Sequence, residues 1–280
     1  MSLIPRLICG FFVSCLLVTF AGCKPEPINP PSSESITKSE REKLGKTLLG
    51  LLKNRPVEYP ILENAGKDTT VYQFVQTLYN QATAMMRLDL NSPAGNRWNQ
   101  ERDWAIYILE NDAVIDAFTL PAGDLFITTG FLKNIEREYE LFYLLSFEAN
   151  LINEKYLLNR MVSEYNTVNL LSIINGAVES NGISVAQVMK DATEFVFSES
   201  EVGDIDAETV PSICNTSVYR GDGISEIIAH EVGATNYWLQ KRMNYDSREE
   251  AIIKLSSDAG NCGSLRTTGA YQDYVLDILD

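Results

Sequence analysis

Apolar residues recur at helical spacing over most of this chain, and two such stretches come before the first strand-like segments. The first covers residues 40–53, where leucines form one stripe and Ser39 is a candidate N-cap. The second covers residues 70–88, where valines, aromatic residues and a methionine fall on one face. Both patterns predict amphipathic helices whose apolar face packs on a core.

Three short β-rich segments follow, at residues 104–109, 114–118 and 125–128. The residues between the second and third, Leu120-Pro121-Ala122-Gly123, are typical of a tight turn. The segments therefore predict a small antiparallel sheet.

After this sheet the pattern is helical almost to the end of the chain. The predicted helices cover 138–165, 167–178, 183–197, 224–243, a segment from Ser247 onward, and 271–279. Residues 198–216 are acidic and contain Pro211, which favours a surface loop. The whole pattern predicts an α+β fold that is mostly helical, with the sheet packed on a helical core.

The first 22 residues have the pattern of a signal peptide. Arg6 supplies a positive start, and the apolar run at 7–20 is too short to span a bilayer comfortably. The next residues, Phe20-Ala21-Gly22-Cys23, resemble a bacterial lipobox. That resemblance implies cleavage before Cys23 and attachment of lipid to its sulfur, and a plain secretory signal is the alternative.

A Pro- and Ser-rich stretch comes next, without apolar periodicity. Such a composition stays extended and solvated, so residues 23–37 are expected to form a lipid-anchored tether. Residues 38–280 then form one domain. The expected location is the bacterial cell envelope, with the lipid anchor in the outer membrane and the domain on its periplasmic or surface face.

Cysteines and charge refine this picture. Two of the five cysteines leave with the signal, and with Cys23 lipidated, Cys214 and Cys262 remain as an even pair in an oxidising compartment. We expect them to form a disulfide, which would stabilise the fold by about 3–4 kcal/mol. The net charge of −15 argues against nucleic acid as a partner and suggests a cationic one.

Three blocks of residues carry a family resemblance. The first is Asp116-Ala117-Phe118-Thr119-Leu120-Pro121-Ala122-Gly123, followed by Phe126-Ile127-Thr128-Thr129-Gly130-Phe131-Leu132. The second is Phe147-Glu148-Ala149-Asn150-Leu151, preceded by Glu140-Leu141. The third is Glu226-Ile227-Ile228-Ala229-His230-Glu231-Val232-Gly233, with Asn244-Tyr245-Asp246 after it. Together they resemble the HtpX-like and CAAX-prenyl-protease-like zinc metallopeptidases, whose fold is of the gluzincin type.

The departures from that family concern its metal site. The family motif H-E-x-x-H places two imidazoles on one helix face around a general-base glutamate. Here the two histidine positions hold Phe147 and Leu151, while Glu148 stands at the base position and Glu226 at the third-ligand position. His230, the only histidine in the chain, replaces the family's aspartate.

Without zinc, Glu148 has no activated water to work with. A lone general base accelerates a reaction only about 10²–10⁴-fold, which is far less than amide hydrolysis requires. We therefore expect no cofactor and a catalytically inactive member, in which Phe147 and Leu151 fill the former metal cavity. Glu148 is then a remnant that is either capped by a nearby donor or partly exposed.

The alternative is a rewired metal-dependent peptidase that uses Glu148, Glu226 and His230. Glu226 and His230 stand four residues apart and share a helix face. They would either join Glu148 around a metal or form an intrahelical hydrogen-bonded pair.

The resemblance also implies a partner. A pseudo-peptidase would keep the substrate groove beside the strand around Phe118 and bind an extended peptide or an envelope protein by adding a strand there. The expected function is thus that of a cell-envelope lipoprotein on a metallopeptidase scaffold, in contact with the membrane through Cys23 and with no role for nucleic acid.

Overall fold

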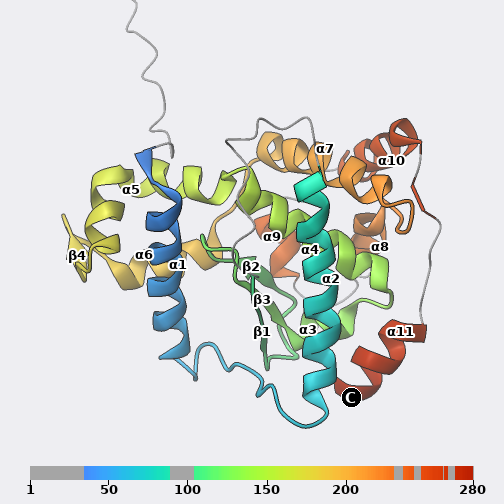
Figure 1. Cartoon of the computed structure of the whole chain (residues 1–280), viewed down its shortest axis with the longest axis horizontal. Coiled ribbons are helices and arrows are strands. Elements are labelled where there is room, and N and C mark those ends of the chain that lie inside the picture. The colour runs from blue at the N-terminus through green and yellow to red at the C-terminus, as the bar shows by residue number, and fades with distance from the viewer. Residues whose placement is uncertain are drawn as a thin grey trace, which may run out of the picture. The chain divides into compact units, whose positions relative to one another are not determined.

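Helices make up most of the described chain, and a small sheet lies among them (Figure 1), so the α+β class is confirmed at this coarse level. The computed structural model describes residues 35–88, 104–229, 236–242, 247–260, 262–263 and 269–279. The predicted signal, Cys23 with its lipidation and residues 23–34 of the predicted tether lie outside these ranges, as do His230 and residues 244–246. The end of the predicted tether belongs to the folded domain instead, because Ile36 is buried and Thr37 caps the first helix. In the described part, no helix has the length and apolar character needed to cross a membrane.

The sheet has the strand order β1-β3-β2 and is mixed, so the predicted all-antiparallel sheet is wrong. Its strands are β1 Ile106–Leu109, β2 Ala117–Thr119 and β3 Leu125–Thr128. β2 and β3 form the predicted antiparallel hairpin, but β3 then inserts beside β1 and runs parallel to it. The chain reverses direction between β1 and β2, and it reverses again in the hairpin between β2 and β3. As a result β3 runs in the same direction as β1 and lies between β1 and β2.

The hairpin turn depends on Gly123. Its amide donates to the Leu120 carbonyl at 2.8 Å, and its φ of +87° is in the region that favours glycine. A side chain at this position would also collide with the ring of Trp104.

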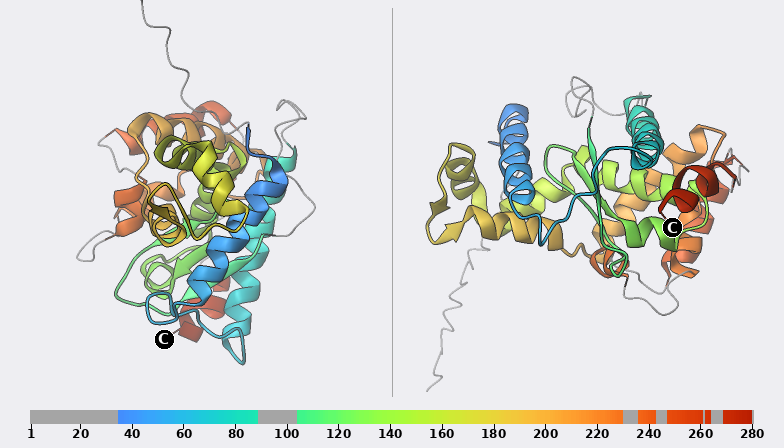
Figure 2. Two further views of the ribbon diagram at one scale, coloured as in Figure 1. Left: turned by 90° about the vertical axis from the view of Figure 1, so that its left-hand side faces the viewer. Right: turned by 90° about the horizontal axis from the view of Figure 1, so that it is seen from below.

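The first two helices are close to their predicted bounds. They are α1 Lys38–Lys53 and α2 Asp68–Leu88. The cap of α1 is Thr37 rather than the predicted Ser39, because Thr37 and Glu40 form a capping box. Helix α1 packs against the α5 and α6 region, while α2 packs on α4 and β1 (Figures 1 and 2).

Helix α4, Glu138–Asn153, is the central element of the core. Every residue from Glu138 to Ile152 is buried, so the helix has no solvent-facing side. Short α3, Thr129–Asn134, precedes it, and α5, Tyr156–Ile174, follows. The predicted single helix over 138–165 is therefore two, separated at Lys155, whose φ is +63°.

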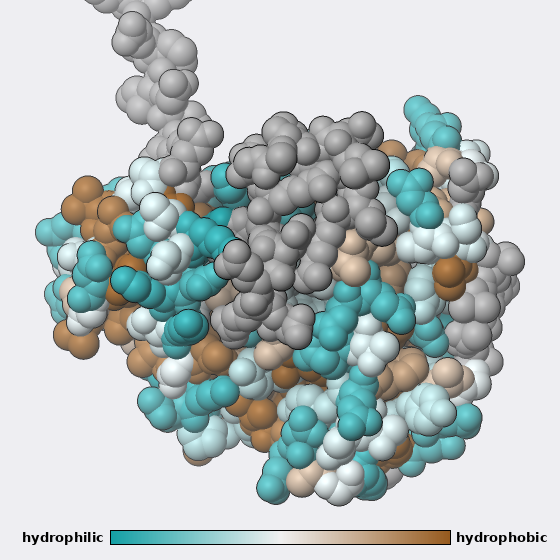
Figure 3. Space-filling model, in the orientation of Figure 1, coloured by the Kyte–Doolittle hydropathy of each residue, from teal (hydrophilic) through white to brown (hydrophobic). Residues whose placement is uncertain are grey.

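A small hairpin follows α5. Its strands are β4 Glu179–Ser180 and β5 Ile183–Ser184, and Asn181 and Gly182 in the turn both have positive φ. Helix α6, Val185–Glu194, comes next, with Ser184 as its N-cap. In the view of Figure 3, apolar residues gather over α5 and β4, a region in which Val168 and Val178 are strongly exposed.

Helix α7, Glu199–Asn215, replaces the predicted surface loop, so that prediction is wrong. Ser198 and Glu201 form a capping box that starts the helix. Val202, Ile205 and Ile213 are buried on one face together with Asp206, while the other acidic residues of the helix lie outside this face, and Pro211 is accommodated inside the helix. The acidity thus marks a solvated face of a helix rather than a loop.

The C-terminal part consists of short helices. They are α8 Gly223–Ala229, α9 Tyr237–Lys241, α10 Arg248–Ala259, α11 Gly269–Tyr271, the π-helix Gln272–Leu276 and α12 Asp277–Leu279. The predicted helix at 224–243 corresponds to α8 and α9. The sulfur atoms of Cys214 and Cys262 lie at disulfide-bonding distance, as the pairing of the two cysteines predicts.

Candidate functional site

Glu148 lies in the middle of α4 and is completely buried. Its carboxylate accepts four hydrogen bonds. Arg242 donates two of them, from Nε at 2.8 Å and from Nη2 at 3.1 Å. Trp238 Nε1 donates at 2.8 Å and Thr119 Oγ1 at 3.0 Å. Such a two-pronged arginine contact is the strong, directional form of a carboxylate ion pair.

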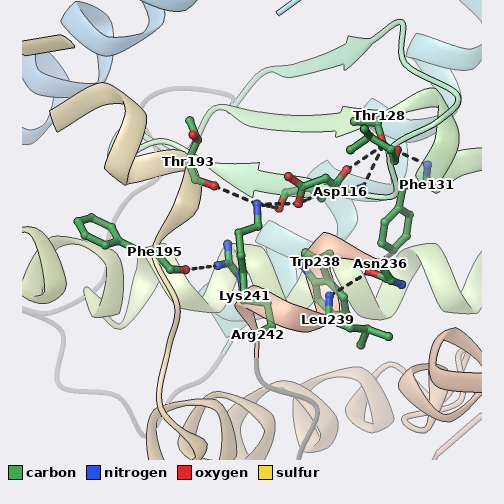
Figure 4. A network of polar contacts seen from close by, with 12 residues as sticks. Asp116, Thr128, Phe131, Thr193, Phe195, Asn236, Trp238, Leu239, Lys241 and Arg242 are labelled. Atoms are coloured by element: carbon green, nitrogen blue, oxygen red, sulfur yellow. Dashed lines mark hydrogen bonds and ion pairs between the residues drawn. The ribbon is translucent and has the colours of Figure 1, made fainter. Parts of the chain in front are cut away.

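Helix α9 supplies most of these donors. The side chain of Asn236 accepts from the amide of Leu239 at 3.0 Å and so starts the helix at a fixed point (Figure 4). Trp238 and Arg242 are then one helical turn apart on the same side, which faces Glu148. Arg242 Nη1 also donates to the Phe195 carbonyl at 3.2 Å, so that the guanidinium is held on two sides (Figure 4).

Phe147 and Leu151, which stand where the resembled motif has its two histidines, are both completely buried. The Phe147 ring meets Trp238 edge-on, with centroids 5.7 Å apart, and stacks near Tyr143 at 6.3 Å. The guanidinium of Arg248 lies 5.2 Å from its centroid. The two positions therefore contribute hydrocarbon packing and no ligand atoms.

A second buried ion pair adjoins the first. Arg248 Nε donates to Asp206 Oδ2 at 2.9 Å, and Tyr143 Oη donates to Asp206 Oδ1 at 2.5 Å. Burial raises the pKa of Tyr143 well above its usual value, so this phenol keeps its proton and donates. Arg248 Nη1 also donates to the Arg242 carbonyl at 3.0 Å, which connects the two ion pairs.

Glu226, at the family's third-ligand position, is held elsewhere. Its Oε1 lies 3.8 Å from Arg137 Nη1, and its charge helps to raise the pKa of Tyr139, which burial raises most. Tyr139 is nine residues before Glu148 on α4, about 13 Å along the helix axis. Arg137 and Tyr139 mark the start of α4, whereas Phe147 to Leu151 form its middle.

These contacts test the site for zinc. Phe147 and Leu151 offer no donor atom, Glu148 already has four hydrogen-bond partners, and Glu226 pairs with Arg137. The residues at the family's ligand positions therefore do not fit a zinc ion. Within the described ranges no three His, Cys, Asp or Glu side chains converge as metal ligands.

The outer edge of β2, where strand addition is predicted, is occupied by the chain itself. The amide of Tyr237 donates to the Ile115 carbonyl at 3.0 Å. Lys241 Nζ lies 3.4 Å from the Ala117 carbonyl, and the Ala117 amide donates to Asp116 Oδ1 at 2.8 Å. The Ile115 carbonyl and both backbone groups of Ala117 thus already have partners in the observed conformation, so an added strand would have to displace Tyr237, Lys241 and the Asp116 side chain from them.

The outer edge of β1 is satisfied in a different way. The amide of Leu62 donates to the Ile108 carbonyl at 2.8 Å, next to an isolated antiparallel β-bridge between Ile61 and Leu109. Beyond it, Gln76 Oε1 accepts from the Ile106 amide at 3.1 Å while Gln76 Nε2 donates to the Trp104 carbonyl at 2.8 Å. The side-chain amide of Gln76 thus replaces a peptide unit of a further strand.

A cavity of about 390 Å³ lies beside Phe118, next to α9. Its described lining is Glu58, Tyr59, Pro60, Leu109, Asn111, Val114, Asp116, Phe118, Thr128, Thr193, Glu194, Tyr237 and Lys241. Lys241 Nζ contacts Asp116 Oδ1 at 2.6 Å and also donates a hydrogen bond to the Thr193 carbonyl at 2.9 Å (Figure 4). The volume is in the usual range for small-ligand sites.

Burial shifts the proton affinity of both members of this pair. It raises the pKa of Asp116 and lowers the pKa of Lys241, while the attraction between the two charges opposes each shift. A cavity that contains such groups is a candidate binding site.

Sequence reasoning identified Glu148, Phe147 and Leu151 but missed the residues that surround them. Trp238, Lys241 and Arg242 lie in a segment whose helical pattern was recognised. Periodicity alone does not tell which basic side chains of that segment turn inward. The excess of acidic residues does not identify the site either, because only a few of the carboxylates, such as those of Glu148 and Asp206, are buried.

No protein-family model matches this chain, and no curated protein is similar enough to count as a relative. The metallopeptidase resemblance therefore rests on the three blocks of residues alone.

Proposed function

We propose that this protein is a cell-envelope lipoprotein built on a zinc-metallopeptidase scaffold, that it lacks peptidase chemistry, and that it binds a peptide segment of another protein. The observation that supports the loss of chemistry is the enclosure of Glu148. Its carboxylate is completely buried and accepts hydrogen bonds from Thr119, Trp238 and Arg242.

A general base must lie within hydrogen-bond reach of the proton that it removes. Both oxygens of Glu148 accept hydrogen bonds from protein donors, and the guanidinium of Arg242 stabilises its charged form. Phe147 and Leu151 pack where two metal ligands would be needed. Glu148 then serves to hold α9 against α4.

The cavity beside Phe118 supports the binding part of the proposal. It lies in the region where the resemblance implies a substrate groove, and aromatic rings and a small set of polar groups line it. The peptide contacts this cavity through a side chain rather than by strand addition, since the β2 edge already pairs with Tyr237 and Lys241.

Zinc content and hydrolysis test the loss of chemistry. The full chain, purified without chelators, is expected to contain far less than one zinc per molecule and to leave a broad peptide library uncut. Stoichiometric, chelator-sensitive zinc with hydrolysis that Glu148→Gln abolishes would overturn the proposal.

His230→Ala tests the rewired peptidase separately. If His230 is a ligand, this substitution removes both bound metal and activity. If metal content and hydrolysis are the same in His230→Ala and in the parent chain, the rewired site is excluded.

The anchor has its own test. Mass spectrometry of the chain expressed in bacteria is expected to show a diacylglyceryl group on Cys23 and no residues before it. Cys23→Ser should then abolish membrane fractionation. An intact, unlipidated Cys23 in a soluble mature chain would show instead a plain secretory signal.

A further inference from the structure

The cavity beside Phe118 has a distinct charge pattern. Among the described residues that line it, three carry carboxylates, Glu58, Asp116 and Glu194, and one, Lys241, carries an ammonium. The side chains of Glu58 and Glu194 are 60% and 55% exposed, whereas that of Asp116 is 19% exposed. The carboxylates thus extend from the exposed rim to the buried floor.

Lys241 does not make the cavity a site for anions. Its ammonium has three N–H donors. They face Asp116 Oδ1 and the Thr193 carbonyl (Figure 4) and, at 3.4 Å, the Ala117 carbonyl. An anionic ligand would find no donor of Lys241 left and would meet the charges of Glu58 and Glu194.

Aromatic rings form the remaining wall. Phe118 already has the Lys241 ammonium 5.4 Å from its ring centroid, and Tyr59 meets Phe118 edge-on at 6.4 Å. Tyr237, which is 45% exposed, also lines the cavity. Ring faces beside carboxylates attract an organic cation and pack against the methylene groups that carry it.

The rim carboxylates have partners that a ligand can replace. Arg55 contacts Glu58 and Lys190 contacts Glu194, each at 3.2 Å, in surface ion pairs whose side chains are between 34% and 60% exposed. Such surface pairs contribute little stability, so their exchange for a bound cation costs little. The overall charge of −15 also favours the approach of a cation.

We infer that this cavity receives the cationic side chain of a lysine or arginine from a polypeptide partner, which extends the peptide-binding function proposed above and rests on it. The cation lies between the rim carboxylates of Glu58 and Glu194, and its alkyl stem packs on the aromatic wall.

Calorimetric titration of the full chain in a zwitterionic detergent tests the inference. The probes are acetyl-Gly-Lys-Gly-amide, the same peptide with norleucine in place of lysine, and n-butylamine. The lysine peptide is expected to bind at least about fivefold more tightly than the norleucine peptide. Its affinity should also fall as ionic strength rises.

Variants locate the binding. Glu58→Gln and Glu194→Gln are each expected to weaken the lysine peptide about two- to fivefold. Glu179→Gln, an exposed position in β4 that does not line the cavity, makes the same charge change and should have no effect. Equal losses in all three variants would overturn the assignment to this cavity.

The other outcomes are distinct. If the norleucine peptide binds as tightly as the lysine peptide, the claim that the cavity recognises a cation is overturned, but peptide binding stands. If n-butylamine binds as tightly as the lysine peptide, the claim that the cation comes from a polypeptide is overturned. If no probe binds, the inference falls, while zinc content and hydrolysis still decide independently whether peptidase chemistry is lost.

Discussion

Two consecutive residues at the end of α9 neutralise two carboxylates in different surroundings. Arg242 pairs with Glu148, which is completely buried on α4, and Lys241 pairs with Asp116, which borders the cavity beside Phe118. Glu148 has all its hydrogen bonds inside the protein. The difference separates a carboxylate that holds the fold together from one that remains near a ligand site.

The cation types suit these surroundings. The planar guanidinium of Arg242 reaches both oxygens of Glu148 and keeps its charge when buried. Lys241 presents a compact ammonium that fits a carboxylate and two carbonyls, and burial lowers its pKa. We call Arg242 and Glu148 the sealed pair, because both are buried, and Lys241 and Asp116 the open pair, because both line the cavity beside Phe118.

The largest expected effect follows from removing Arg242. Arg242→Met leaves Glu148 charged and buried without its main partner, which should cost about 3–5 kcal/mol of unfolding free energy. Urea unfolding at pH 7 measures this loss. Lys190→Met, which removes an exposed pair on α6, is the control and should change stability by less than about 0.5 kcal/mol. Similar small losses in both variants would contradict the sealed role of Glu148.

How far the sequence predicts this arrangement differs between its parts. The helices α1 and α2 and strand β3 follow from regular apolar spacing and are found nearly where expected. The mixed sheet is not predictable in this way, because strand order depends on where the chain crosses between β1 and β2. Helix α7 was missed because its acidic face and Pro211 resemble a loop.

The residues of the candidate site also differ in how far the sequence predicts their positions. Burial of Phe147 and Leu151 was expected, because two large apolar residues on a core helix have no favourable place in water. The partner of Glu148 was not, since it comes from a helix about 90 residues later in the chain. Long-range pairing of charges depends on tertiary packing, which one sequence does not specify by periodicity.

A third buried carboxylate extends the comparison. Burial raises the pKa of Glu140 on α4 to about 7, although the amide of Glu136 donates to it. Between pH 4.5 and 7 the folded state thus holds a proton that the unfolded state has released, so stability should fall as the pH rises through this window.

Glu140→Gln removes that dependence. The variant should match the parent chain near pH 4.5 and exceed its stability by up to about 3 kcal/mol above pH 7. Urea unfolding at a series of pH values from 4.5 to 8 measures the difference. A difference that stays constant over this range would show that Glu140 titrates normally.

A smaller effect is expected for the open pair. Lys241→Met leaves Asp116 beside the cavity and removes the charge that opposes the rise of its pKa by burial, so the pKa of Asp116 should rise further. The expected loss is about 1–3 kcal/mol in urea unfolding, part of it from the carbonyls of Thr193 and Ala117 that lose a donor. A loss as large as that of Arg242→Met would abolish the distinction between the two pairs.

The smallest effect should come from removing both members of the sealed pair. Glu148→Leu combined with Arg242→Met eliminates the cost of burying two charges together with their attraction, and such exchanges are often neutral or stabilising. Thr119 and Trp238 then lose an acceptor, at a cost of about 1 kcal/mol each. We therefore expect the double variant to be within about 2 kcal/mol of the parent chain and clearly more stable than Arg242→Met alone. If the two substitutions simply add, Glu148 and Arg242 do not depend on each other, and the carboxylate must be held by its remaining donors.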